Sequence, residues 1–148
     1  DISVLREWLS KERELQSKVV VRQIPGLQFT SGGFSIYAGR TAKENDELLR
    51  KHVRGNDYWL HTRDYPGGYI FIRTAKGKSV PLDTLLDAWN LAVHFSKGKN
   101  NHRADVYYTQ VKYLRRAKDG PTGLVIPTQE KNLSITRDEG RLKRLLGE

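Results

Sequence analysis

The apolar residues of the chain recur at two spacings, and each spacing predicts a different kind of element. Between Pro81 and Lys97, leucines, a tryptophan and small apolar residues recur three and four positions apart, with Pro81 in the first turn and Gly98 at the stop. This pattern is typical of a helix with one buried face. By contrast, Tyr69–Ile72 is a continuous apolar run, which predicts a central strand.

Shorter runs predict further strands. Leu27–Thr30 and Phe34–Ala38 are separated by Ser-Gly-Gly, which indicates a hairpin. In the run 58–62, alternation places Trp59 and His61 on one face and the other three residues on the opposite face. The remaining strands are expected at Val106–Thr109, continued by the basic run Lys112–Lys118, and at Leu124–Ile126 and Leu133–Ile135.

Two more helices are predicted beside these strands. Thr41 can cap a helix that runs to about Val53, because Glu44 three residues later completes a capping box. Asp138 begins a basic terminal helix. Residues 3–18 form a helical pattern with a narrow apolar stripe, followed by Val19–Val21, a β-branched lead-in strand. Either that helix lies on the domain, or it is the end of a coiled coil with a helical protein partner.

Together these elements predict an α+β fold. We expect a mostly antiparallel sheet of about five to seven strands with the helix 81–97 packed on one face. A length of 148 residues fits one domain. The expected organisation is residues 1–24 as a helix and lead-in strand, and residues 25–148 as the domain proper.

Charge and composition narrow the classes of function. Lys and Arg number 26 against 17 Asp and Glu, a net charge of +9, which favours polyanionic partners. Cysteine is absent, which excludes disulfides and thiolate metal sites. No apolar run approaches the length of a membrane span, so we expect no membrane association and a cytoplasmic location. The absence of any Met, an initiator included, fits a part of a longer protein.

The positive charge is concentrated in one segment. Residues 96–118 carry seven cationic residues and one carboxylate, Asp105, with Tyr107, Tyr108 and Tyr113 interleaved. Cations neutralise phosphates and aromatic rings stack on unpaired bases, so this mixture is typical of RNA binding. The alternative interpretation is an edge strand protected by solvated charge.

Signals for catalysis are sparse. No pair among the four His has metal-ligand spacing, and no nucleophile or phosphate-cradle motif is present, so neither a metal nor a cofactor is predicted. One enzymatic alternative is a nucleic-acid-processing enzyme that uses His61 with Asp57 or Asp46 as an acid–base pair. The simpler interpretation of His61 is a strand residue with a satisfied hydrogen bond.

The order and spacing of several motifs resemble the NFACT-R domain, over about Leu27–Thr136. The matching motifs are Gly39-Arg40, Asn45-Asp46, Asp57-x-Trp59-Leu60-His61-Thr62, Pro66-Gly67, an apolar helix ending Ser96-Lys97, Val106-x-Tyr108-Thr109, Val111-Lys112, Gly123-x-Val125 and Lys131-x-Leu133. The resemblance implies an RNA-binding module of the translation machinery, with tRNA and the large ribosomal subunit as partners in ribosome-associated quality control of stalled nascent chains. The chain departs from the family's Pro-Gly-Ser-His-Val turn, where it has Pro-Gly-Gly-Tyr-Ile at 66–70. Stacking by Tyr69 is therefore a substitute hypothesis for the family's histidine.

The motif match and the basic segment together predict one RNA-binding surface and no catalytic residue. Its expected members are Arg40, Lys43, Asn45, Asp46, Trp59, His61, Tyr69, Lys97, Lys99, Arg103, Tyr108, Lys112, Arg115, Arg116 and Lys131. The alternatives left open are the His61 enzyme, a protein-interaction module that docks through the N-terminal helix, and a DNA-binding module, since phosphate contacts do not distinguish DNA from RNA.

Overall fold

The computed structural model describes residues 2–21 and 24–147, with the backbone only for residues 12–21. Its helices and helical turns are α1 (Ile2–Val21), α2 (Ala42–Glu47), the π-helical turn η1 (Leu48–His52), α3 (Leu82–His94), the 3₁₀ turn η2 (Val111–Tyr113) and α4 (Glu139–Leu146). Its strands are β1 (Leu27–Ser31), β2 (Phe34–Gly39), β3 (Tyr58–Thr62), β4 (Tyr69–Ile72), β5 (Arg103–Gln110), β6 (Leu114–Arg116), β7 (Val125–Pro127) and β8 (Lys131–Thr136).

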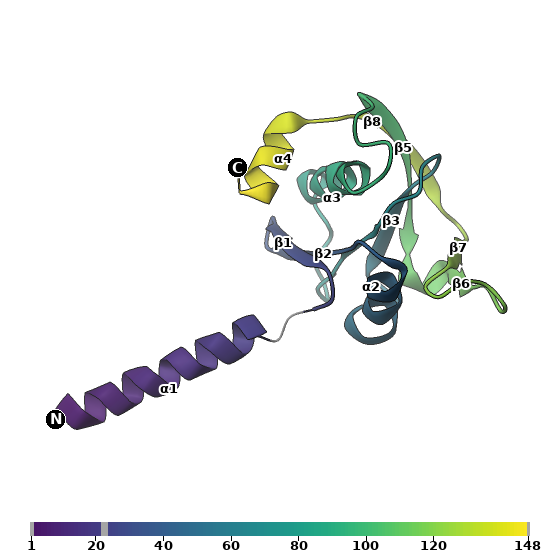
Figure 1. The fold of residues 1–148 in the computed structure, drawn as a ribbon. Helices are drawn as coiled ribbons and strands as arrows, with labels where there is room; N and C mark the ends of the chain where they lie inside the picture. Colours follow the sequence, from purple (N-terminus) through teal and green to yellow (C-terminus); the bar gives the residue numbers. More distant parts are fainter. Residues whose placement is uncertain (1, 22–23, 148) are drawn as a thin grey trace.

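A six-stranded antiparallel sheet organises the described part of the chain, in the order β1-β2-β4-β3-β5-β8 (Figure 1). The short strands β6 and β7 form a separate two-stranded sheet. The predicted α+β class with a mostly antiparallel sheet is confirmed. Both faces of the sheet are covered near its centre, because Trp59 and Leu60, which point to opposite faces of β3, are 2% and 1% exposed.

The helices α3 and α4 cover one face of the sheet (Figure 1). Ala92 and Val93 of α3 pack with Leu60 and Ile70 of the strands, as the apolar spacing of that helix predicts. Leu82, the first residue of that spacing, is wrong as a core residue, because it is 68% exposed at the start of α3. Buried Asp87 connects α3 to β1 and to α4: Ser31 Oγ of β1 donates to its carboxylate at 2.5 Å, and Arg141 Nη1 of α4 donates to it at 3.0 Å. We call this face of the sheet the α3 side.

The opposite face, here called the α2 side, is covered by α2, η1 and the β6–β7 hairpin. Its core consists of Leu48, Trp59, Tyr69, Phe71 and Val125. The predicted cap is confirmed, because Thr41 Oγ1 accepts from the Glu44 N–H at 3.1 Å. Glu44 Oε1 in turn accepts from the Arg40 N–H at 2.9 Å, one residue earlier than a standard capping box.

Two predicted strands are wrong. Val19–Val21 continue α1 as its last helical residues and do not form a lead-in strand. The basic run 112–118 does not extend β5, because η2 turns the chain out of the main sheet. The residues that follow this turn form β6 and pair with β7. The N–H groups of Val111 and Lys112 donate to the carbonyls of Asp57 and Gly55, which holds this turn against the end of β3.

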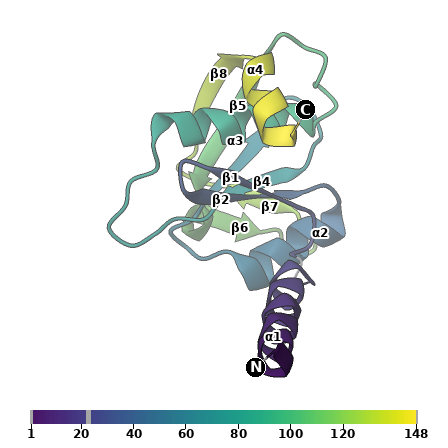
Figure 2. The same cartoon turned by 90° about the vertical axis from the view of Figure 1, so that its left-hand side faces the viewer.

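The helix α1 projects from the rest of the molecule in both views (Figure 1, Figure 2). The apolar side chains of its described part are exposed, among them Ile2 at 68% and Trp8 at 57%. The sequence left open whether this helix lies on the domain or continues a coiled coil, and its exposed stripe does not pack on the sheet. No described helix is both long and apolar enough to cross a membrane.

Candidate nucleic-acid interface

A shallow hollow of about 350 Å³ on the α2 side brings together several residues of the predicted surface. It lies where the β2–α2 connection, the end of β3, the turn before β4 and the loop before β7 meet. Its lining is Arg40, Thr41, Ala42, Asn45, His61, Pro66, Gly67, Tyr69, Pro121, Thr122, Gly123 and Leu124. We call this feature the α2 hollow.

Glycines allow α2 to approach the sheet closely enough to form the hollow. A Cβ on Gly68 would lie 2.0 Å from the Gly39 carbonyl oxygen, and a Cβ on Gly39 would lie 2.1 Å from Asn45 Oδ1. With no side chain in the way, buried Asn45 accepts from the Tyr69 N–H through Oδ1 at 3.3 Å. Asn45 therefore attaches α2 to the first residue of β4, and its amide oxygen is occupied by the fold.

The carboxylate of Asp46 is also used within the fold, because two arginines donate hydrogen bonds to it. Arg50 Nε donates to it at 2.7 Å and Arg116 Nη1 at 2.6 Å. These hydrogen bonds, first that of Arg116 and then that of Arg50, lower the pKa of the Asp46 carboxyl. The carboxylate is neutralised by two guanidinium groups, and it ties α2 to β6.

His61 forms one wall of the hollow. Its Nε2 lies 3.2 Å from the Gly67 carbonyl oxygen, which can only accept, so Nε2 carries the proton. The ring stacks on Trp59 at 5.8 Å between centroids and meets Tyr69 edge-on at 5.3 Å. Burial lowers the pKa of His61, partly offset by the bond to Gly67, which favours the neutral imidazole. His61 is thus an uncharged, hydrogen-bonded strand residue.

The acid–base pair of the enzymatic alternative is not formed. Asp57 accepts from the Arg54 N–H at 2.8 Å and from Thr74, and pairs with Arg73 at 2.8 Å. Asp46 is held by its two arginines. Neither carboxylate is bonded to His61, and among the side chains that the structure describes, those of residues 2–11 and 24–147, no group of three metal ligands comes together.

Two aromatic residues of the predicted surface are buried. Trp59 is 2% exposed and Tyr69 is 7% exposed, and the Tyr69 hydroxyl accepts from the Val125 N–H at 3.3 Å. Burial raises the pKa of this hydroxyl. The hypothesis that Tyr69 stacks on a base does not fit its position, because the ring packs between α2 and the β7 loop.

The exposed cations divide into paired and unpaired groups. Arg40 lies 3.4 Å from Glu44, whose pKa falls because hydrogen bonds from Arg40 outweigh the opposing effect of burial. Arg103 Nε donates to Ser134 Oγ at 2.8 Å, and Lys112 Nζ lies 3.3 Å from Asn56 Oδ1. Among the exposed cations that form no ion pair with any residue described by the structure are Lys43, Lys97, Lys99, Arg103, Lys112, Arg115, Lys118 and Lys131.

One of these unpaired cations, Lys97, is tied to the rim of the α2 hollow through its main chain. The Lys97 N–H donates to the carbonyl of Pro66, a lining residue, at 2.9 Å, so Lys97 follows the rim of the hollow. Arg115 precedes Arg116, which is bonded to α2 through Asp46. The carboxylates of Glu44 and Asp46 on α2 are both paired with arginines.

Tyr108 and Lys131 do not join this surface. In the strand register Tyr108 lies opposite Leu60 and also opposite Lys131, so both share the α3 side with Leu60. Lys131 Nζ lies 5.9 Å from the centre of the Tyr108 ring. The predicted surface is therefore split between two faces of the sheet, and whether its members contact RNA stays a prediction.

Sequence reasoning missed part of the hollow. The loop 121–124 closes its outer side, and Gly123, at a φ of 77°, lies so near α2 that a Cβ would stand 2.6 Å from the Ala42 carbonyl oxygen. The spacing Pro-x-Gly after a basic strand is a turn signal that could have indicated this loop. Its contact with Ala42 of α2, 81 positions earlier in the chain, carries no local sequence signal.

The family model described as "NFACT protein RNA binding domain" matches residues 20–132. Among curated proteins, the Rqc2 homolog RqcH of Bacillus subtilis is 27% identical over 98% of this chain and 26% of its own length. The Rqc2 homolog RqcH of Streptococcus pneumoniae strain D39 is 30% identical over 93% of this chain and 23% of its own length. A Drosophila melanogaster protein named "Ribosome quality control complex subunit NEMF homolog" is 25% identical over 62% of this chain and 10% of its own length.

A solved structure has a similar fold. The C-terminal part of the fibronectin/fibrinogen-binding protein from Streptococcus suis superposes with a TM-score of 0.72 and 28% identity, over 84% of this chain and 49% of the other. The present chain spans about a quarter of the length of the bacterial relatives.

Proposed function

The chain belongs to the family of NFACT RNA-binding domains, and from this we propose that it is an RNA-binding module of ribosome-associated quality control. The names of its relatives support this role, because they refer to Rqc2 and to a ribosome quality control complex. Work on ribosomes would place the protein in the cytoplasm. The proposal concerns binding alone, since the chain corresponds to about a quarter of those bacterial relatives.

The observation that carries the proposal is the separation of paired and unpaired charge around the α2 hollow. Glu44 and Asp46 are neutralised by arginines, while Lys97, whose main chain is bonded to Pro66 of the lining, forms no ion pair with a described residue. Such a surface presents a net positive field to an approaching phosphate backbone. Neutralising phosphates releases condensed counterions, which makes this binding favourable and strongly dependent on salt.

Structured RNA, tRNA or ribosomal RNA, is the ligand that we propose. A hollow of about 350 Å³, with Arg40 in its lining and Lys97 at its rim, can receive the phosphate backbone of a folded RNA. Trp59, His61 and Tyr69 support the hollow from beneath and take no direct part in base reading, because they are buried or hydrogen-bonded within the fold.

The test is a titration of the chain against tRNA, a single-stranded RNA and duplex DNA of similar length, each at several salt concentrations. We expect a steep fall of affinity with salt and tighter binding of tRNA than of the other two. Equal affinity for duplex DNA would reduce the proposal to a general polyanion binder. Binding that does not depend on salt, or no binding at all, would refute it and favour a protein ligand, as the name of the Streptococcus suis relative suggests for that protein.

We also propose that α1 pairs with a helical protein segment. Ile2, Leu5, Trp8 and Leu9 are exposed to between 39% and 68%, which is unfavourable for an isolated helix in water. Removing residues 1–24 should leave RNA binding intact and abolish any self-association seen by analytical ultracentrifugation. An unchanged sedimenting mass would exclude pairing between copies and leave a different partner protein as the ligand of α1.

A further inference from the structure

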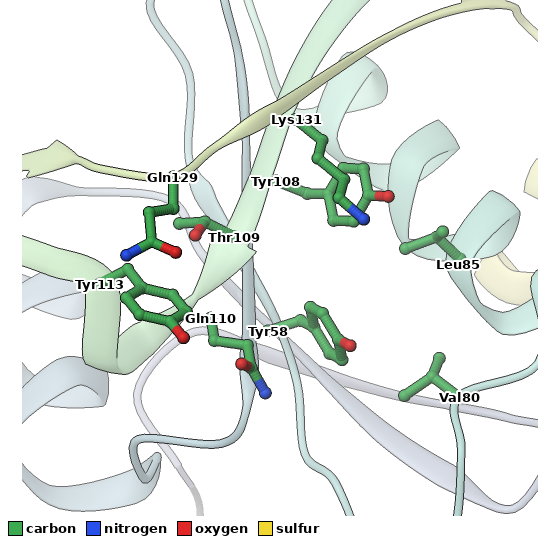
Figure 3. Close-up of a pocket in the computed structure, with 9 residues that line it drawn as sticks. All are labelled: Tyr58, Val80, Leu85, Tyr108, Thr109, Gln110, Tyr113, Gln129 and Lys131. Carbon is green, nitrogen blue, oxygen red and sulfur yellow. The ribbon is translucent and has the colours of Figure 1, made fainter.

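A second cavity, of about 330 Å³, opens on the α3 side of the sheet, away from the α2 hollow (Figure 3). We call it the tyrosine pocket. Its polar and aromatic lining consists of Tyr58, Tyr108, Thr109, Gln110, Tyr113, Gln129 and Lys131, with two aliphatic side chains closing one end. The volume lies at the lower end of the roughly 300–1,000 Å³ range of small-molecule sites.

Aromatic rings enter the pocket from two sides. Tyr58 and Tyr108, neighbours on β3 and β5, meet at 6.3 Å between centroids and 46° between planes. Tyr113 of η2 stands across the cavity from Tyr58 (Figure 3). No hydrogen bond joins the three hydroxyl groups to another residue that the structure describes. A flat aromatic ligand could therefore enter between the rings and find free hydroxyl donors.

Two side-chain amides supply further polar groups. Gln110 donates to the Asn56 carbonyl at 3.2 Å through Nε2, which leaves its amide oxygen able to accept. The amide of Gln129 has no hydrogen-bond partner among the groups that the structure describes, and it lies beside Tyr113 (Figure 3). Gln129 has a φ of 53°, an unfavourable backbone conformation for a residue with a side chain, which the chain nevertheless adopts at the pocket wall.

Cations stand at both aromatic walls. Lys131 Nζ lies 5.9 Å from the Tyr108 ring centre, and Lys112 Nζ lies 5.3 Å from the Tyr113 ring centre. The ligand that matches stacking rings, amide donors and acceptors, and flanking positive charge is a nucleotide: a planar base with a polar edge and adjoining phosphates. We propose that the tyrosine pocket receives one unpaired nucleobase of the bound RNA, stacked against Tyr113 and hydrogen-bonded by Gln129.

The inference rests on the proposed RNA binding and extends it to the other face of the sheet. The turn η2, which carries Lys112 and Tyr113, leads directly into β6, which carries Arg115 and Arg116. A strand of RNA can thus follow a continuous line of cations from the α2 hollow, around the end of β5, to the pocket. The α2 side and the α3 side of the sheet would then bind the same RNA strand.

The test compares two ligands: a labelled seven-nucleotide single-stranded RNA and a ribose-phosphate backbone of the same length that lacks bases. The full-length chain is titrated with each, and the ratio of the two affinities is the preference for bases. Stacking and pairing of one base predict a preference of roughly tenfold or more. Tyr113→Ala and Gln129→Gly should each lose most of this preference and keep the affinity for the bare backbone.

Both substitutions are chosen so that the variant chains should still fold. The Tyr113 main-chain carbonyl, which accepts from Thr128, is retained in Tyr113→Ala, and glycine adopts the positive φ of position 129 more readily than glutamine does. Gln129→Gly should therefore unfold at the same temperature or higher. The control Gln28→Ala removes an exposed amide on β1, far along the sheet, and should leave the preference unchanged.

The outcomes separate this inference from the proposed function. Binding of both ligands with a preference that survives Tyr113→Ala and Gln129→Gly overturns the pocket and leaves RNA binding in place. Failure of the unmodified chain to bind either ligand overturns the proposed function, and the pocket with it. Loss of the preference in both pocket variants, with the control unchanged, supports the assignment.

Discussion

Arg116 and Asp46, separated by 70 positions in the sequence, meet through a 2.6 Å hydrogen bond between Nη1 and Oδ1. The contact joins β6 to α2 and so closes one side of the α2 hollow. Its neighbour Arg115 is also exposed and forms no ion pair with any residue in the described ranges. Two adjacent arginines thus have different tasks: Arg116 holds the hollow together, and Arg115 is free to meet a phosphate.

Charge reversal should therefore distinguish the two arginines. Arg115→Glu is expected to weaken tRNA binding and to reduce the salt slope by about 1, with the free energy of unfolding unchanged within about 0.5 kcal/mol. Arg116→Glu should weaken binding and also lower the melting temperature, because it places a carboxylate beside Asp46. The measurements are salt-dependent titration and thermal unfolding. Equal melting temperatures for both variants would contradict the holding role of Arg116.

Asn45 is expected to act through the fold. Its amide oxygen satisfies the buried Tyr69 N–H at 3.3 Å, so Asn45→Ala leaves that donor without a partner and should reduce the free energy of unfolding by about 1–3 kcal/mol. The matched control is Lys43→Ala, an exposed change on the same helix, which should shift stability by no more than about 0.5 kcal/mol. Urea unfolding measures both, and a smaller loss for Asn45→Ala than for the control would be inconsistent with this role.

The stability of the domain should fall in mild acid because of His61. Burial lowers its pKa below the ordinary 6.5, so the unfolded chain takes up the proton at a higher pH than the folded chain does. The contribution of neutral His61 is complete above pH 6.5 and declines as the pH falls from 6.5 toward the folded pKa, by at most about 1.4 kcal/mol per pH unit.

The matched variant for this dependence is His61→Gln, whose amide can still donate to the Gly67 carbonyl but does not titrate. Urea unfolding at a series of pH values between 8 and 5 should show a shallower decline for the variant than for the unmodified chain. Parallel declines would show that His61 is not the cause of the dependence.

Gly68 should tolerate no side chain. A Cβ there would lie 2.0 Å from the Gly39 carbonyl oxygen, a main-chain atom of a paired strand, so Gly68→Ala must push β2 and β4 apart. A loss of about 1–3 kcal/mol is expected, as for other overpacked sites. Gly140→Ala is the control with the opposite sign: its Cβ meets nothing closer than 3.4 Å within α4, and alanine favours a helix by about 0.5–1 kcal/mol. Calorimetry should therefore show a lower melting temperature for the first variant and a higher one for the second.

The regular elements of the main sheet could be predicted because each carries a complete local signal. The hairpin 27–38, the strand at 58–62 and the helix at 82–94 have an apolar period and a stop or turn residue within a few positions. The wrong predictions occurred where the same residues are compatible with two kinds of secondary structure. Val19–Val21 has strand propensity but ends a helix, and the basic run after Tyr108 continues an extended pattern although η2 redirects it.

The candidate site divides in the same way. The sequence by itself determined that this chain carries an excess of cations, that they cluster in residues 96–118, and that Trp59 and His61 share one face of a strand, because residue type and alternation are local properties. Only the tertiary structure decided that Asp46 and Arg116 meet, that Trp59 and Tyr69 are buried beneath the hollow, and that Tyr108 and Lys131 lie on the opposite face of the sheet. These relationships depend on strand register and on the close approach of glycines at positions 39 and 68, where main-chain atoms from distant parts of the sequence come into contact.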